Sequence, residues 1–443
     1  MKKTAIGIVF LLFIVALGSY YQLHAVPYIV IVAVVAVTVL IALNKINERY
    51  YPVYIYGLAL ALLWQTSMLG SHIVGADIHG EFFVANKAIT EGWNWSFAHV
   101  NNTSVVIGGL TPLLAKLGIS PVWQFKALYP AVFAAVPVIL YIAYSRMFGT
   151  KRAYFASLFF MIVPVFFVEI VGIVKSMVAE VFLALMVLLM VINIKSWLRI
   201  LGLGVAVTLA ALCHYTIGIL AAMYLVGCFV VLLVGKKWLR TRMTVLASYG
   251  LAIIIVFTSV YFWYSSSGDG FMFKYLNDVG HNVTAAAIYF LPKSTILEPT
   301  ITEPTITEPI ILEPIILEPE DSNTKSSWLR QEPLVRAAVG LDFADVEPEG
   351  KAFRILQYLT QFLIVTGFYY LIRRNMFTSE FITGVIVSFG LLGMVLFFPT
   401  FSSIVNASRF YHVSLFFLAP LLIIGTEGIV NDLERLRCLR EHR

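Results

Sequence analysis

Long apolar runs separated by short polar segments dominate the chain, and this pattern sets the expected fold. A run of about twenty apolar residues crosses the roughly 30 Å hydrocarbon core of a bilayer as a helix. Because the runs are continuous rather than alternating, they favour helices over the strands of a membrane barrel. The sequence therefore predicts an all-α polytopic transmembrane helical bundle of about 12 spans. The predicted spans are residues 5–20, 28–43, 53–69, 122–144, 154–173, 177–194, 198–213, 216–234, 243–264, 353–372, 381–398 and 413–430.

Composition supports a membrane protein and excludes several other classes. Hydrophobic residues make up 60% of the 443-residue chain and charged residues only 13%, about half the share found in soluble domains. Three cysteines, with no pair at zinc-binding spacing, exclude a disulfide scaffold. The net charge of +6 does not indicate a nucleic-acid partner, because the basic residues fall between apolar runs rather than on one patch. The expected partners instead include membrane lipids.

The basic residues predict the orientation. If the amino terminus is cytoplasmic, most of the 31 lysines and arginines fall in the inner segments, and every inner loop holds some. Positive charge is typical of cytoplasmic loops. We therefore expect a multi-pass protein of the cell membrane with both termini in the cytoplasm. The start, Met1-Lys2-Lys3 before a short apolar stretch, also resembles a signal peptide, but no A-x-A cleavage site follows it.

Two long outer segments divide the chain into four predicted regions. The first outer segment is expected to hold interfacial helices, one of them near 110–117. The second contains a five-residue repeat ending in Glu-Pro, and proline at every fifth position disfavours a helix or a central strand, so an extended spacer is expected. The predicted regions are an N-terminal transmembrane hairpin (1–52), a transmembrane core (53–264) that includes the first outer loop (70–121), a long outer loop (265–352) with the repeat at 295–319, and the C-terminal spans with a short cytoplasmic tail (353–443).

Polar residues near the ends of apolar spans are costly in a membrane and are therefore candidates for function. Those of this chain share one depth, close to the predicted outer boundary, so a site is expected to face outward. They are Asp77, His79 and Glu81 after the third span; Glu169, Lys175 and Glu180 around the turn between the fifth and sixth; His214 and Tyr215 between the seventh and eighth; and Arg409, Tyr411 and His412 at the start of the last.

Asp77 and Glu81 are the sharpest local signal. If this segment is helical, the two carboxylates lie four residues apart on one face. Such a pair can ligate a divalent cation, or one member can carry a proton while the other orients it. The alternative is that both cap a helix at the membrane surface and are simply solvated.

The other polar residues carry alternatives of the same kind. Lys175 either balances Glu169 and Glu180 within a structural cluster or holds an anionic headgroup. His214 is either a ligand or an ordinary interfacial histidine. Arg409 is either an interfacial anchor or a phosphate contact.

Two sets of motifs resemble known families. The acidic motif in the first outer loop, followed by Gly92-Trp93 and Trp95, resembles the C-type glycosyltransferase superfamily, multi-span enzymes that take sugars from polyprenyl-phosphate donors. The segments Lys175-Ser-Met-Val-Ala-Glu-Val-Phe182 and Asn406-Ala-Ser-Arg-Phe-Tyr-His412, with Leu418-Ala-Pro420, look closer to archaeal predicted membrane proteins without an assigned function. That family is itself similar to the C-type transferases.

The resemblance implies a membrane glycosyltransferase that moves a sugar from a polyprenyl-phosphate donor to a protein or lipid-glycan acceptor on the outer face. Asp77 matches the catalytic acid of the family motif, and Glu81 is the second member. Lys175 and Arg409 are expected to hold the donor phosphate, with or without a divalent metal ion. The supporting candidates are His79, Glu169, Glu180, His214, Tyr215, Tyr411 and His412.

This sequence departs from the transferase pattern in ways that keep other functions open. The acidic motif follows the third span rather than the first, and there is no strict Asp-Glu or D-x-D pair. A transporter or flippase of lipid-linked glycans would use the same residues as a translocation path, and an assembly factor with the same fold would not need them for catalysis. Transporters usually place charged sites near the midplane within repeats. The clustering of charge at one face therefore favours the transferase.

Overall fold

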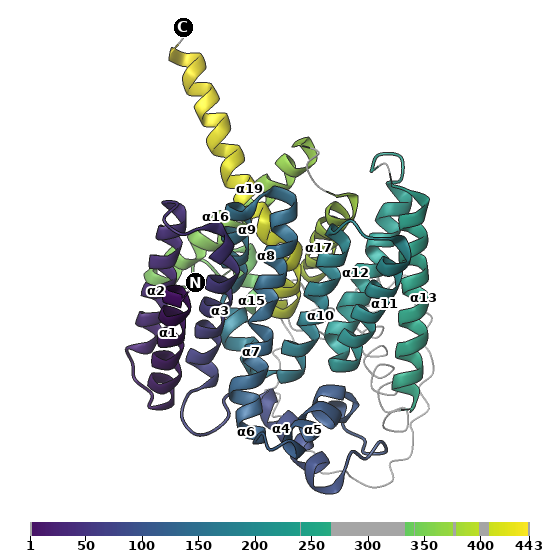
Figure 1. The fold of residues 1–443 in the computed structure, drawn as a ribbon. Helices are drawn as coiled ribbons and strands as arrows, with labels where there is room; N and C mark the ends of the chain where they lie inside the picture. Colours follow the sequence, from purple (N-terminus) through teal and green to yellow (C-terminus); the bar gives the residue numbers. More distant parts are fainter. Residues whose placement is uncertain are drawn as a thin grey trace, which may run out of the picture.

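The computed structural model describes residues 2–239, 241–266, 333–340, 342–374, 378–397 and 407–441. These residues form helices joined by loops, without strands (Figure 1). Most of the predicted outer loop 265–352, including the repeat at 295–319, lies outside the described residues. The helices are α1 (Lys2–Tyr20), α2 (Val26–Ala42), α3 (Tyr51–Ser67), α4 (Asp77–Glu91), α5 (Thr111–Lys116), α6 (Pro121–Trp123), α7 (Tyr129–Phe133), α8 (Ala135–Phe148), α9 (Thr150–Ile162), α10 (Val174–Val191), α11 (Ser196–Cys213), α12 (Tyr215–Val234), α13 (Met243–Ser266), α15 (Pro333–Val339), α16 (Pro348–Arg374), α17 (Ser379–Phe397) and α19 (Ala407–Glu441).

The prediction of a helical membrane bundle is confirmed. Within the described ranges, eight helices are long and apolar enough to cross a membrane, and a bent pair makes a ninth. The predicted runs at 5–20, 28–43 and 53–69 are the shorter helices α1, α2 and α3. The protein is therefore a polytopic membrane protein.

One predicted span is broken. The run at 154–173 consists of Thr150–Ile162 and Val165–Gly172, which meet at an angle of 58°. Pro164 lies at the break. Its ring removes a backbone donor and clashes with a continuing helix, which accounts for the bend. The second half ends beside the first outer loop, because Gly172 lies against Gly75.

The segment predicted as the first outer loop (70–121) forms a helical cap over one end of the bundle. Figure 1 shows α4, α5 and α6 together at this end, while the C-terminal end of α19 projects from the opposite end. In α4, the buried residues recur at helical spacing, so one face packs against the bundle; they are Ile78, Glu81, Val84, Ala85 and Ala88. Glu81 is the exception among these apolar side chains, and it leads to the site described below.

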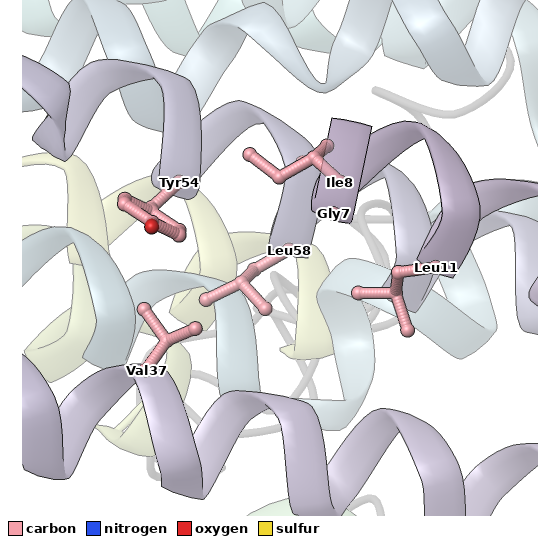
Figure 2. A pocket seen from close by; sticks show the side chains of 7 residues that line it. Gly7, Ile8, Leu11, Val37, Tyr54 and Leu58 are labelled. Atoms are coloured by element: carbon pink, nitrogen blue, oxygen red, sulfur yellow. The ribbon is translucent and has the colours of Figure 1, made fainter. Parts of the chain in front are cut away.

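The N-terminal helices enclose an apolar cavity at a distance from this cap. Figure 2 shows the cavity, about 160 Å³, between α1, α2 and α3. Gly57 allows the close approach of α1 to α3, since a Cβ at this position would lie 2.6 Å from Ile8. The lining is apolar apart from Tyr54, so this cavity offers no catalytic groups; its residues are Gly7, Ile8, Leu11, Val37, Tyr54, Gly57 and Leu58.

The orientation is testable with the chain's own cysteines. Cys438 is exposed on the projecting end of α19, whereas Cys213 and Cys228 are buried. If this end is cytoplasmic, a membrane-impermeant maleimide should label Cys438 only after the cells are permeabilised. A Lys116→Cys variant in a Cys438→Ser background places a thiol on the cap and should be labelled in intact cells. Labelling of Cys438 in intact cells would reverse the orientation.

Candidate functional site

A polar cavity lies beneath the cap, where residues from distant parts of the chain meet. Its volume is about 360 Å³. Five of the residues predicted from sequence line it, and they come from α4, α10, the α11–α12 turn and α19. The lining residues are Ala76, Asp77, Gly80, His99, Val100, Asn101, Lys175, His214, Tyr215 and Arg409. The fold therefore brings these five of the eleven predicted residues to one cavity.

Asp77 and Arg409 form an ion pair at the mouth of the cavity. The Arg409 Nη2 atom lies 3.3 Å from Asp77 Oδ2. The Asp77 side chain is 63% exposed and that of Arg409 is 17% exposed. Asp77 is also the first residue of α4, where the helix dipole favours a negative charge. The pair has a single contact and a solvated partner, so it is weakly held and open to exchange.

Glu81 has a different role in the structure from Asp77. Its side chain is completely buried and does not line the cavity. Oε2 accepts hydrogen bonds from the backbone N–H groups of Val174, at 2.8 Å, and Lys175, at 3.4 Å. These are free donors at the start of α10, so Glu81 caps that helix from outside it.

Lys175 connects the buried carboxylate to the cavity. Its Nζ atom lies 3.6 Å from Glu81 Oε1 and donates a hydrogen bond to Asn101 Oδ1. The ring of Tyr215 lies beside the ammonium group, with its centroid 5.9 Å from Nζ. Lys175 is itself 9% exposed at the side chain. An ammonium this well enclosed is held in one place, which suits it to bind an anion that enters the cavity.

Burial dominates the electrostatics of Glu81. It raises the pKa of this carboxyl from its ordinary value of 4.5 to about 7, even though the Lys175 ammonium and two backbone amides oppose the change. Burial, together with the charge of Lys175, lowers the pKa of His99, which also lines the cavity. Near neutral pH, His99 in the cavity is therefore neutral. The Glu81 carboxyl, which lies behind the cavity wall, gains and loses its proton in the same pH range.

His214 lies in the turn between α11 and α12 and lines the cavity. Its Nδ1 atom is 3.0 Å from the Ser176 hydroxyl. The side chain is 2% exposed, so its orientation is fixed by this contact. Lys175 and Ser176 are adjacent on α10. The first turn of this helix therefore places the Lys175 side chain at the cavity and holds the His214 ring there.

Residues behind the cavity hold the start of α19. The Ser408 hydroxyl donates a hydrogen bond to Glu169 on the broken span. One turn further along α19, His412 Nε2 lies 3.0 Å from Glu180 Oε2, and both side chains are buried. Rings surround this histidine: Phe133, Phe160, Phe166 and Phe416. Glu169, Glu180 and His412 thus orient the helix that carries Arg409, rather than lining the cavity.

Two predicted residues stand apart from this arrangement. His79 is exposed on α4 and does not line the cavity, and Tyr411 is half-buried against the core. Within the described residues, no group of three histidine, cysteine or acidic side chains is placed to hold a metal ion. Glu81, one of the two carboxylates predicted to bind a cation, accepts hydrogen bonds from two backbone amides through Oε2.

Sequence reasoning missed the wall that contains Asn101. This wall is a short 3-10 helix, Val100–Thr103 (η2), at the edge of the cavity. Its polar residues Asn101, Asn102 and Thr103 are all buried. The Asn102 amide donates to the carbonyl oxygens of Asn94, at 2.8 Å, and Phe97, at 3.0 Å, and so folds the loop around itself. The signal in the sequence was the polar run itself, but only the fold shows that it is buried.

Comparison with known proteins agrees with the membrane architecture. Residues 343–442 match the family described as Predicted membrane protein (DUF2206). The matched segment contains α16, α17 and α19, and with them Arg409. No curated protein and no solved structure matches the chain. The C-terminal part is therefore similar to a family whose description names a membrane protein and no activity.

The raised pKa of Glu81 predicts a specific dependence of stability on pH. A carboxyl with a raised pKa binds its proton more tightly in the folded state than in the unfolded state. The contribution of Glu81 to stability should therefore fall as pH rises from about 4.5 to about 7. We expect the thermal unfolding midpoint in lipid nanodiscs to fall across this range, and the fall to be smaller in Glu81→Gln. Glu91→Gln, on the exposed end of the same helix, is the control. Equal pH profiles for wild type and Glu81→Gln would contradict this prediction.

Proposed function

We propose that this protein transfers a sugar from a polyprenyl-phosphate donor to an acceptor at the outer face of the membrane. The observation that carries the proposal is the cavity that brings Asp77, Lys175 and Arg409 together at the end of the bundle. A lipid-linked donor keeps its chain in the bilayer and its phosphate at the boundary. Two cations and an accessible carboxylate at that depth suit the phosphate and the acceptor respectively.

The two cations are suited to the donor phosphate in different ways. Lys175 is enclosed and fixed by Glu81 and Asn101, so it provides a positioned positive charge. Arg409 is more accessible and provides a planar group that binds two phosphate oxygens at once. Both positive charges stabilise the negative charge that develops on the phosphate as it leaves.

Arrival of the donor would also free the base. In the structure described here, Asp77 contacts Arg409 through one pair of atoms at 3.3 Å. The anionic phosphodiester of the donor competes for the same guanidinium and displaces the carboxylate. Asp77, at the accessible start of α4, is then available to the acceptor. In this scheme the donor is bound before the base becomes active.

The chemical step is a single displacement. Asp77 takes the proton of an acceptor hydroxyl, and the acceptor oxygen forms a bond to the anomeric carbon. The bond from that carbon to the phosphate oxygen breaks, and polyprenyl phosphate leaves with the electron pair. One displacement inverts the anomeric configuration. Lys175 and Arg409 supply positive charge to the leaving phosphate.

Two substitutions separate the proposed roles. Asp77→Asn keeps the shape but removes the base, so the transfer rate should fall about a hundredfold or more. Donor binding should stay near the wild-type value, since both cations remain. Arg409→Ala removes a charge-assisted contact and should weaken donor binding about tenfold or more. The measurement is transfer from polyprenyl-phosphate sugars to membrane and secreted acceptors by full-length protein in proteoliposomes.

Glu91→Gln is the matched control for these variants, because it removes an acid from α4 at the end away from the cavity. Its transfer rate should equal that of the wild type. Wild-type transfer by well-folded Asp77→Asn would overturn the role of the base. Absence of transfer by the wild type with every donor tested would contradict the proposal and favour a flippase of lipid-linked glycans or an assembly factor.

A further inference from the structure

Three tryptophans from two parts of the chain form a cluster on the cap. The rings of Trp93 and Trp95 are stacked, with centroids 4.5 Å apart and an angle of 22° between their planes. Trp263, near the end of α13, forms a T-shaped contact with Trp95, with the ring centroids 4.9 Å apart and an angle of 73° between the planes. The cluster adjoins the wall Val100–Thr103, whose other side faces the polar cavity.

Two of the three tryptophans form hydrogen bonds to the backbone of the cavity wall. The Trp93 indole N–H donates to the carbonyl oxygen of Asn102 at 3.1 Å, and that of Trp263 donates to Thr103 at 2.9 Å. Gly108 makes room for Trp93, because a Cβ there would lie 2.4 Å from the indole ring. Trp93 and Trp263 therefore hold the cavity wall in place through its backbone.

Trp95 has no such task. It is 40% exposed, and within the described residues its indole N–H makes no hydrogen bond. Its neighbours Asn94 and Ser96 are also exposed. Stacking on Trp93 fixes the ring, so a partner would meet a rigid surface and lose little entropy on binding. Trp95 therefore packs within the cluster and still presents part of a rigid aromatic ring to solvent, which a ligand with an apolar face can contact.

We propose that Trp95 is a stacking platform for a sugar ring of the acceptor; the acceptor role rests on the proposed function, whereas sugar binding at Trp95 does not. A pyranose ring has a face of C–H groups, which packs on the flat indole, and a rim of hydroxyls. The exposed amide of Asn94 and hydroxyl of Ser96 lie next to the ring in sequence and can bond such hydroxyls.

The surroundings favour a sugar over a lipid chain. Tryptophans that anchor spans in the membrane interface are found at the ends of apolar helices. Trp95 lies instead in the loop between α4 and η2, where the nearby residues Glu91, Asn94 and Ser96 are exposed. Its place across the wall from the donor cavity also suits an acceptor, which approaches the donor from the aqueous side.

The test measures sugar binding without requiring transfer. Full-length protein in nanodiscs, free of sugar-based detergent, is titrated with methyl glycosides of glucose, galactose, mannose and N-acetylglucosamine, and binding is followed by saturation-transfer NMR. At least one glycoside should bind through the C–H protons of one ring face. Trp95→Ala should weaken this binding about fivefold to tenfold, the scale of one aromatic contact. Trp95→Tyr, which keeps an aromatic face, should retain most of it.

Trp123 provides the matched control. It is 50% exposed, is the last residue of α6 at the same end of the bundle, and lies in the candidate span Pro121–Phe148. Trp123→Ala should leave glycoside binding unchanged. Absence of binding to every glycoside, or equal binding by wild type and a folded Trp95→Ala variant, would overturn the proposal. Equal losses of membrane yield in Trp95→Ala and Trp123→Ala, without glycoside binding, would make Trp95 an interfacial anchor.

These measurements test the transferase mechanism and the sugar platform separately. If glycoside binding depends on Trp95 while transfer is absent with every donor, the sugar platform stands and the transferase mechanism falls. If Asp77→Asn abolishes transfer while Trp95→Ala changes neither binding nor transfer, the mechanism stands and the platform falls.

Discussion

The buried contact between Glu81 and Lys175 is the constraint on which the site beneath the cap depends. A carboxyl and an ammonium group removed from water are stable only when they are paired and their remaining hydrogen bonds are made. Here Glu81 meets that requirement by accepting two backbone amides of α10 and facing Lys175. The contact fixes α4 against the end of α10. Because Asp77 precedes Glu81 by one turn, the same contact places Asp77 at the mouth of the cavity.

Each cation of the site already has an acidic partner, but the two pairs differ in how firmly they are held. Glu81 is buried and bonded on several sides, whereas Asp77 is largely exposed and makes one contact to Arg409. The first pair is therefore structural and the second exchangeable. This asymmetry gives the proposed mechanism its order, since only the exchangeable pair yields to an incoming phosphate.

Much of the fold was predictable because the bilayer imposes a simple requirement on sequence. Runs of about twenty apolar residues must be helices in a membrane, and all the predicted runs fall on helices. The break at Pro164 was missed because hydropathy continues through it.

Shared depth identified Lys175 and Arg409 as neighbours in space. The sequence did not show that Asp77 is exposed and Glu81 buried. Helical spacing places both on one face of α4 but does not show what packs against that face. Asn101 and the tryptophan cluster depend on contacts between distant segments, which one sequence does not reveal.

In the mechanism that we propose, a phosphate-bearing lipid displaces Asp77 from Arg409 in the cavity beneath the cap. The most direct measurement is an electron cryo-microscopy structure of the full-length protein in nanodiscs with and without a polyprenyl phosphate. Our account predicts phosphate density within hydrogen-bond distance of both Arg409 and Lys175, with the Asp77 carboxylate moved away from Arg409 and the Glu81–Lys175 contact unchanged. Density for the phosphate elsewhere, or an Asp77–Arg409 pair that persists beside the bound lipid, would contradict it.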